Sequence, residues 1–282
     1  MKSIVVTGAS TGIGRSITEM LIPKGFHVFG SVRKQADAER LKSDLGVGFT
    51  PLTFDITDEA AVYAAAKQVR EHLKGETLLG LVNNAGIAVA APMLYLKPND
   101  FRKQMEINVT GQLIVTQAFT PLLGADRSLN GNPGRIVNIT SVSGKNGSPF
   151  LGAYAASKHA LEGLSESMRR ELMLYGIDVI IVAPGPIATP IWDKAEEVDA
   201  EQYKHTDYYE SGKKFQKYTI KKGRSGLPPE AVSKAVVKAL TASKPRVRYA
   251  INPDPFMSWL MSMLPKRLLD SIMAKGLGLS KK

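Results

Sequence analysis

Short apolar segments alternate with longer amphipathic segments through the first two thirds of the chain. The amphipathic segments have helical length and predict helices over 13–23, 36–45, 58–73, 99–123 and 154–175. The apolar segments are rich in Val, Ile and Leu without regular polar alternation, which predicts strands covered on both faces. This order of strand, helix and strand is typical of a parallel sheet with helices on both sides. The predicted strands are 4–6, 28–32, 52–54, 78–82, 136–139 and 179–182.

The alternation stops after Pro184. Residues 185–226 are rich in Pro, Lys, Tyr and Gly, and we expect them to form a substrate lid or a partly helical insertion. A helix is predicted to resume at Pro228-Pro229-Glu230, and a last strand at 247–251. Residues 252–282 are an apolar and basic C-terminal extension. No linker precedes residue 185, so we predict a single domain over 1–282.

The basic charge is confined to the last third of the chain. The net charge is +11, yet residues 1–199 carry 20 basic and 20 acidic side chains, so the whole excess lies in 200–282. Phe256, Trp259, Leu260, Met263 and Leu264 follow at helical spacing. This stripe either packs on the core or the substrate cavity, or lies on a membrane surface with Lys266 and Arg267 toward lipid phosphates. The interleaved tyrosines and lysines also resemble an RNA-binding segment, but their place favours a lid, and no nucleic-acid partner is predicted.

Composition excludes several classes of protein. The chain has no cysteine, and its four histidines lack zinc spacing, so no metal site is predicted. No apolar run reaches the roughly 18 residues that cross a bilayer. The first apolar segment is too short for a signal peptide, so we expect a cytoplasmic protein, with membrane association as an alternative.

A glycine-rich turn follows the first predicted strand. Its sequence is Thr7-Gly8-Ala9-Ser10-Thr11-Gly12-Ile13-Gly14. Glycines between a first strand and a first helix let backbone N–H groups approach a dinucleotide pyrophosphate at the helix N-terminus. The spacing differs from the general dinucleotide fingerprint, and a simple tight loop is the alternative. We predict cofactor contacts from Gly8, Ser10, Thr11, Gly12, Ile13 and Gly14.

The end of the second predicted strand indicates the cofactor. Folds that bind NAD place an acid there for the ribose hydroxyl, whereas Arg33 and Lys34 stand here. A guanidinium binds a 2′-phosphate, so Arg33 favours NADP(H) over NAD(H). The alternative is two solvated basic residues.

Tyr154 and Lys158 are four residues apart on a predicted helix and therefore share a face. A nearby ammonium lowers the pKa of a phenol, which would make Tyr154 a general acid or base. Ser141 lies just before this helix, after a predicted strand. The Tyr-x-x-x-Lys spacing alone is common on helices.

Together these motifs resemble the short-chain dehydrogenase/reductase family. The resemblance runs through TGASTGIG at 7–14, NNAG at 83–86, Asn108, Ser141, YAASK at 154–158 and Pro184-Gly185 with Thr189. It implies a Rossmann-like, doubly wound parallel sheet of about seven strands and hydride transfer between nicotinamide and a carbonyl or alcohol.

The resemblance also implies roles for the residues. Tyr154 would exchange the proton, Ser141 would bind the substrate oxygen, and Lys158 would bind the nicotinamide ribose and tune Tyr154. Asn108 would hold a water next to Lys158. The adenosine would contact Asp55, Ile56, Asn83, Ala85 and Gly86, and the nicotinamide amide would contact Pro184, Gly185, Ile187 and Thr189.

The tail resembles the retinol and 17β-hydroxysteroid dehydrogenase branch through Arg248-Tyr249, Asn252-Pro253-Asp254 and the segment 264–270. Phe150 and Trp192 would form an apolar substrate wall. These features predict an NADP(H)-dependent oxidoreductase of lipophilic ketones, aldehydes or alcohols. A homodimer or homotetramer is also implied. The alternative is a non-catalytic regulator or scaffold that binds NADPH.

Overall fold

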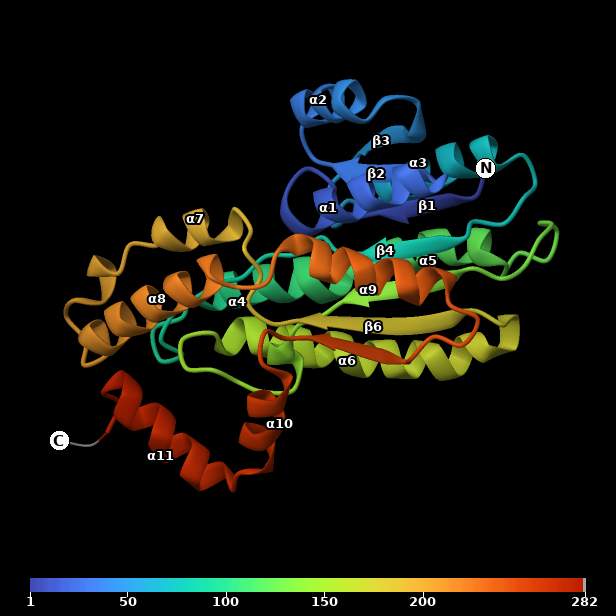
Figure 1. Ribbon diagram of the computed structural model, residues 1–282. Helices are drawn as coiled ribbons and strands as arrows, with labels where there is room; N and C mark the ends of the chain where they lie inside the picture. Colours follow the sequence, from blue (N-terminus) through green and yellow to red (C-terminus); the bar gives the residue numbers. More distant parts are fainter. Residues whose placement is uncertain (281–282) are drawn as a thin grey trace.

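The computed structural model describes residues 1–280 and is built on one seven-stranded parallel sheet (Figure 1). The strand order is β3-β2-β1-β4-β5-β6-β7. It reverses between β1 and β4, where doubly wound sheets form a ligand crevice. The predicted doubly wound fold is confirmed. The strands are β1 Ser3–Val6, β2 His27–Val32, β3 Phe49–Thr53, β4 Gly80–Asn83, β5 Arg135–Ile139, β6 Asp178–Pro184 and β7 Arg248–Ile251.

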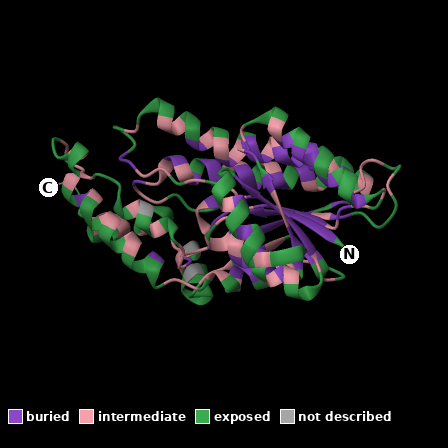
Figure 2. Ribbon diagram, turned by 90° about the horizontal axis from the view of Figure 1, so that it is seen from above, coloured by how far each residue is buried: buried purple, intermediate pink, exposed green. Residues whose placement is uncertain are grey.

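Helices cover both faces of the sheet, and Figure 2 shows the strands buried between them. In β1, Ile4 and Val6 face one core and Val5 faces the other. Both sides of the strand are therefore apolar, which explains the lack of polar alternation in the sequence. One face is covered by α1 Gly12–Leu21, α2 Gln35–Leu45 and α9 Pro229–Thr241, and the other by α3 Glu59–Leu73, α5 Gly111–Phe119 and α6 Gly152–Glu171.

Several predicted boundaries differ from the structure, such as the strand predicted at 52–54, which is β3 Phe49–Thr53, and two of the differences have clear local reasons. The predicted strand 78–82 begins at Gly80, because Leu78 donates its N–H to the carbonyl of Leu122 outside the sheet. The predicted helix 99–123 is interrupted: α4 Pro98–Met105 is followed by a π-helical turn, η3 Glu106–Thr110, before α5 begins. The short 3₁₀ segments are η1 Ile22–Lys24, η2 Gly46–Gly48, η4 Thr120–Leu123, η5 Val142–Gly144, η6 Leu172–Tyr175 and η7 Glu201–Tyr203.

The segment 185–226 is largely helical, with α7 Ile191–Glu196 and α8 Tyr209–Arg224. After β7, the chain forms α10 Pro255–Met263 and α11 Lys266–Leu277, which lie outside the layered body, with α11 beside α8 (Figure 1). The stripe divides between the predicted alternatives: Trp259 lines the cavity at the carboxyl ends of the strands, whereas Phe256 and Met263 do not pack on the core. Phe256 and Met263 are 68% and 66% exposed, because α10 leaves the sheet after β7.

Candidate active site

A large cavity of about 1980 Å³ lies at the carboxyl ends of the strands. Its floor is made by the turns that follow β1, β4, β5 and β6, which parallel strands bring to one edge of the sheet. Residues of α7 and α8 line it as well, and so do residues of α10 and α11. Most predicted site residues line this cavity; the exceptions are Gly14, Asn83 and Asn108.

The glycine-rich turn is shaped by close backbone contacts. Gly8 has a φ of +68°, and its N–H donates to Ser31 Oγ at 3.0 Å. A Cβ on Gly14 would lie 2.2 Å from the carbonyl oxygen of Gly8, so only glycine fits there. Gly14 therefore shapes the turn from behind, while Ser10, Thr11, Gly12 and Ile13 line the cavity. The open backbone at the start of α1 is suited to a pyrophosphate.

Asn84, which the sequence analysis missed, fastens this turn to the end of β4. Its Nδ2 donates to the carbonyl oxygens of Thr7 at 2.9 Å and Gly8 at 3.2 Å. Asn83 does not line the cavity: its side chain donates to Thr116 and Asn138 inside the core, so its contact with a cofactor stays a prediction. Successive residues of a strand point to opposite faces, and this alternation is the signal that distinguishes the two asparagines.

The adenosine end of the cavity is lined by Arg33, Asp55 and Ile56. Arg33 follows β2 directly and is exposed at the rim. Within the described chain, no carboxylate forms an ion pair with it. Asp55 Oδ1 accepts hydrogen bonds from the N–H and hydroxyl of Thr57, which fixes the turn after β3. Ala85 and Gly86 line the cavity beside them.

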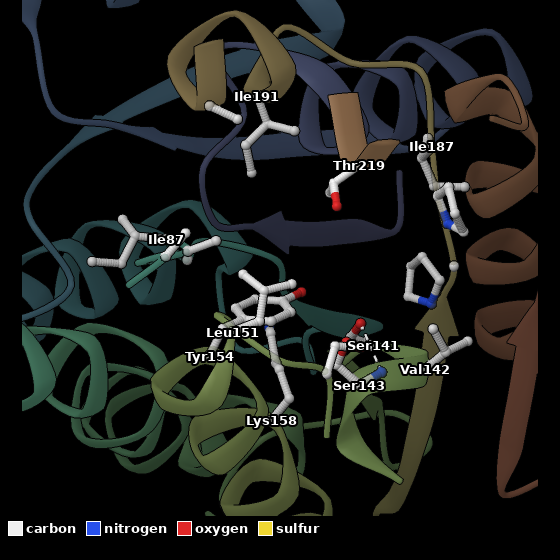
Figure 3. A pocket seen from close by; sticks show the side chains of 18 of the residues that line it. Ile87, Ser141, Val142, Ser143, Leu151, Tyr154, Lys158, Ile187, Ile191 and Thr219 are labelled. Atoms are coloured by element: carbon white, nitrogen blue, oxygen red, sulfur yellow. Dashed lines mark hydrogen bonds between the residues drawn. The ribbon is translucent and has the colours of Figure 1, made fainter. Parts of the chain in front are cut away.

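Tyr154, Lys158 and Ser141 come together at the centre of the cavity (Figure 3). Tyr154 and Lys158 rise side by side from α6, with the Lys158 Nζ atom 5.9 Å from the centre of the tyrosine ring. Ser141 caps η5 after β5, and its Oγ accepts from the N–H of Ser143 at 3.1 Å. The Ser141 side chain lies near enough to the Tyr154 hydroxyl to influence its pKa.

The charges of this group differ from the expectation. Burial raises the pKa of Tyr154, and the nearby Ser141 side chain offsets only part of this effect. Burial also lowers the pKa of Lys158 to about 8. The prediction that Lys158 lowers the pKa of Tyr154 is therefore not met here, because the loss of water on burial is the largest influence on the phenol. The phenol is held in its protonated form at neutral pH.

Lys158 and Asn108 are fixed from behind the cavity. Lys158 Nζ donates to the carbonyl oxygen of Ile139 at 2.9 Å. The Asn108 side chain accepts from the N–H of Ile87 at 2.8 Å and donates to its carbonyl oxygen at 2.9 Å. It also donates to Ser157 Oγ at 3.1 Å. The π-helical turn that carries Asn108 thus clamps the chain that follows β4 against α6, and such turns are frequent at functional sites.

A buried ion pair, also missed, supports Ser141 from the next turn of α6. Glu162 is 3% exposed and accepts from the Thr140 hydroxyl at 3.0 Å. The Arg248 guanidinium donates to both of its carboxylate oxygens at 2.9–3.2 Å, and Lys145 lies 3.4 Å away. This pair joins β7 to the segment that carries Ser141. The sequence could have indicated this residue, because Glu162 follows Lys158 by four positions and therefore lies on the same face of the helix.

The segment after β6 closes the opposite side of the cavity. Pro184, Gly185, Ile187 and Thr189 all line it. Gly185 donates its N–H to Ile251 at 2.7 Å, which ties this segment to β7. A Cβ on Gly12 would lie 3.4 Å from Thr189 Cβ, so the segment meets the glycine-rich turn directly.

Phe150 and Trp192 line the outer, apolar part of the cavity. Phe150 has a φ of +64° and contacts Phe215 of α8, with ring centroids 5.2 Å apart. The Trp192 indole donates to the carbonyl oxygen of Ile187 at 2.6 Å and lies against Gly223 of α8, where a Cβ would overlap the ring. Both side chains therefore connect the helical segment 185–226 to the body.

Comparison with known proteins agrees with this geometry. The family model described as short chain dehydrogenase matches residues 2–200. An NADPH-dependent 3-dehydrocapnine reductase of Ornithobacterium rhinotracheale is 40% identical over 278 residues, covering 98% of each chain. Human retinol dehydrogenase 5 is 35% identical, covering 96% of this chain and 87% of its own. A short-chain dehydrogenase from Streptomyces avermitilis has a similar structure, with a TM-score of 0.74 and 26% identity, covering 97% of this chain and 94% of that one.

The site and the sheet together define a Rossmann-like oxidoreductase. The chain belongs to the short-chain dehydrogenase/reductase family and resembles its retinol dehydrogenase branch.

Proposed function

We propose that the protein is an NADP(H)-dependent reductase of lipophilic ketones or aldehydes, with Tyr154 as the proton donor. The observation that carries this proposal is the group of Tyr154, Ser141 and Lys158 at the centre of the cavity. The raised pKa of Tyr154 favours the protonated phenol, which is the form that reduction of a carbonyl consumes.

In this proposal the Ser141 and Tyr154 hydroxyls both bind the substrate oxygen. Donors held in place before the reaction stabilise the negative charge that develops there, and Tyr154 then transfers its proton to that oxygen. The reduced nicotinamide, when bound, supplies the hydride. Lys158, fixed by Ile139, binds the nicotinamide ribose and lies beside the phenol as it loses its proton. Asn108 keeps α6 and the chain after β4 in register.

The residues present fit a dinucleotide with a 2′-phosphate. A Cβ on Gly14 would collide with the Gly8 carbonyl oxygen and one on Gly8 would crowd Ala85, so both glycines are needed for the shape of the turn, and Arg33 stands at the rim where the adenosine ribose would lie. The predicted adenosine and nicotinamide contacts remain proposals for the same cofactor. The name of the 40% identical relative, an NADPH-dependent reductase, supports this choice over NAD(H).

Arg33→Asp tests the cofactor. It removes a cation and adds an anion at the proposed phosphate site, so the ratio of kcat/KM for NADPH to that for NADH should fall by about tenfold or more. Lys34→Asp, at the adjacent exposed position, is the matched control. An unchanged ratio in Arg33→Asp would show that Arg33 does not contact the phosphate.

The lipophilic substrate is proposed from the cavity wall and the relatives. Ile87, Val142, Leu151 and Ile191 face the space in front of Tyr154 (Figure 3). Such a wall binds an apolar body while a few polar groups orient one oxygen. We further propose that residues 185–226 act as the lid of one catalytic domain, and that the protein forms a homodimer or homotetramer.

The direct assay is a panel of carbonyl compounds, followed by loss of NADPH absorbance. 3-Dehydrocapnine, named for the relative, comes first, with retinal and steroid ketones beside it. The proposal predicts turnover with at least one lipophilic carbonyl and weaker turnover of its short-chain analogue. Tight NADPH binding without any turnover would instead favour a non-catalytic NADPH-binding protein.

A further inference from the structure

The helix α11 has two apolar sides with different surroundings. Leu269 and Met273, four residues apart, line the cavity. Leu268 and Ile272, also four residues apart, face outward and are 49% and 47% exposed. Packing against the cavity explains why Leu269 and Met273 are apolar, but it does not explain the other pair. The second pair places apolar surface in contact with the surroundings of the protein.

The helix α10 continues this outward apolar surface. Phe256 and Met263 are 68% and 66% exposed and do not line the cavity. Trp259 is 57% exposed but also lines the cavity, and its ring lies 6.0 Å from that of Phe256. On the other side of α10, Met261 lines the cavity. The two helices are therefore a thin apolar wall between the cavity and the exterior. Large exposed apolar patches mark interaction sites.

Basic side chains frame this wall. Lys266 and Arg267 begin α11, and Lys275 lies in its last turn. Ser211 of α8 donates to the carbonyl oxygen of Gly278 at 3.1 Å, which brings the basic helix α8 to the end of α11. Four further exposed lysines of α8 extend the basic surface: Lys213, Lys217, Lys221 and Lys222.

We propose that α10 and α11 lie in the interfacial layer of an anionic lipid bilayer. The apolar wall would enter the boundary between headgroups and acyl chains, with the surrounding cations on the lipid phosphates. The basic charge favours a bilayer over a second copy of the chain as the partner of the apolar wall. A second copy would bring like charges together, whereas an anionic lipid surface complements them. No helix within residues 1–280 is long and apolar enough to cross a membrane.

The position of the wall suggests a role for the membrane contact in substrate access, and this role rests on the proposed function. Because α10 and α11 line the cavity on their inner side, a lipophilic substrate would pass from the bilayer between them without entering water. The bilayer contact itself stands on the exposed residues and charges and does not require a particular substrate.

The test is co-sedimentation of the full chain with vesicles of phosphatidylcholine, with and without about 30 mol% phosphatidylglycerol. Binding should require the anionic lipid and weaken at high salt. Leu268→Gln/Ile272→Gln should reduce partitioning about tenfold or more, because it removes two apolar side chains that the bilayer would bury. The matched control, Met173→Gln/Leu174→Gln, replaces two residues of η6 that are 71% and 70% exposed and should bind as the wild type does.

Two further measurements make the result decisive. Arg267→Gln/Lys275→Gln should weaken binding to anionic vesicles, and circular dichroism should show that all variants remain folded. Equal sedimentation of the wild type and Leu268→Gln/Ile272→Gln, or no binding of the wild type, overturns the proposal. So does a wild-type dimer that this variant converts to a monomer without any vesicle binding, which would assign the wall to a second copy.

The outcome is separable from that of the proposed function. Reduction of a water-soluble carbonyl without vesicles should be equal in the wild type and in Leu268→Gln/Ile272→Gln. If vesicle binding occurs and no carbonyl is reduced, the proposed function fails and the membrane contact stands.

Discussion

Replacement of Lys158 should stabilise the unliganded protein while removing its activity. Burial lowers the pKa of this lysine from 10.5 to about 8, so the folded protein holds a cation at neutral pH at a cost of about 3 kcal/mol. Lys158→Met removes that cost and keeps the apolar stem. It also removes the hydrogen bond to Ile139, worth about 1 kcal/mol. The expected net gain in the free energy of unfolding is about 2 kcal/mol at pH 7.

The pH dependence separates this effect from improved packing. Below pH 8 the lysine is charged in both the folded and the unfolded states, so its cost is constant. Between pH 8 and 10.5 the unfolded chain binds the additional proton, so the wild type gains stability as the pH rises. The advantage of Lys158→Met should therefore shrink to near zero at about pH 9.5.

Urea unfolding of the wild type and the variant at both pH values measures the difference. Lys238→Met, at an exposed lysine of α9, is the matched control and should change stability little at either pH. A variant less stable than the wild type at pH 7, or an advantage that is the same at both pH values, would refute the reasoning.

Two structural predictions concern the supports of the site. Gly14→Ala should abolish NADPH binding measured by fluorescence titration, because its Cβ would lie 2.2 Å from the Gly8 carbonyl oxygen, whereas Gly163→Ala, with open space on α6, should bind normally; equal binding by both would contradict the tight turn. Arg248→Met should lower the free energy of unfolding by about 3 kcal/mol in urea, since Glu162 keeps a buried carboxylate without its main partner; a loss below about 0.5 kcal/mol would show that this pair is dispensable.

Local pattern was enough to predict the sheet because each buried strand is covered on both faces. The apolar run from Ile4 to Val6 is continuous because alternate residues of this strand pack into the cores on the two faces of the sheet. Helical spacing likewise placed Tyr154 beside Lys158. These predictions depend only on the period of the backbone.

Features that depend on contacts between distant segments could not be predicted from local sequence patterns. The π-helical turn at Asn108 is held by the backbone of Ile87, 21 residues away, and no local pattern announces it. The pKa of Tyr154 depends on burial, which spacing does not give. The exposure of Phe256 depends on where α10 leaves the sheet. Asn84 could have been found, because the side of a strand on which each residue points follows from the register.

The proton donor is the central claim, and Tyr154→Phe tests it most directly. The variant keeps the ring and loses only the hydroxyl, so NADPH should bind with unchanged affinity in a fluorescence titration. Turnover of the carbonyl found in the panel should fall by about a hundredfold or more, as expected for loss of a general acid. Ser143→Ala, at a neighbouring hydroxyl that lines the cavity, should retain most of its activity. Wild-type turnover by Tyr154→Phe would contradict the assignment of the phenol.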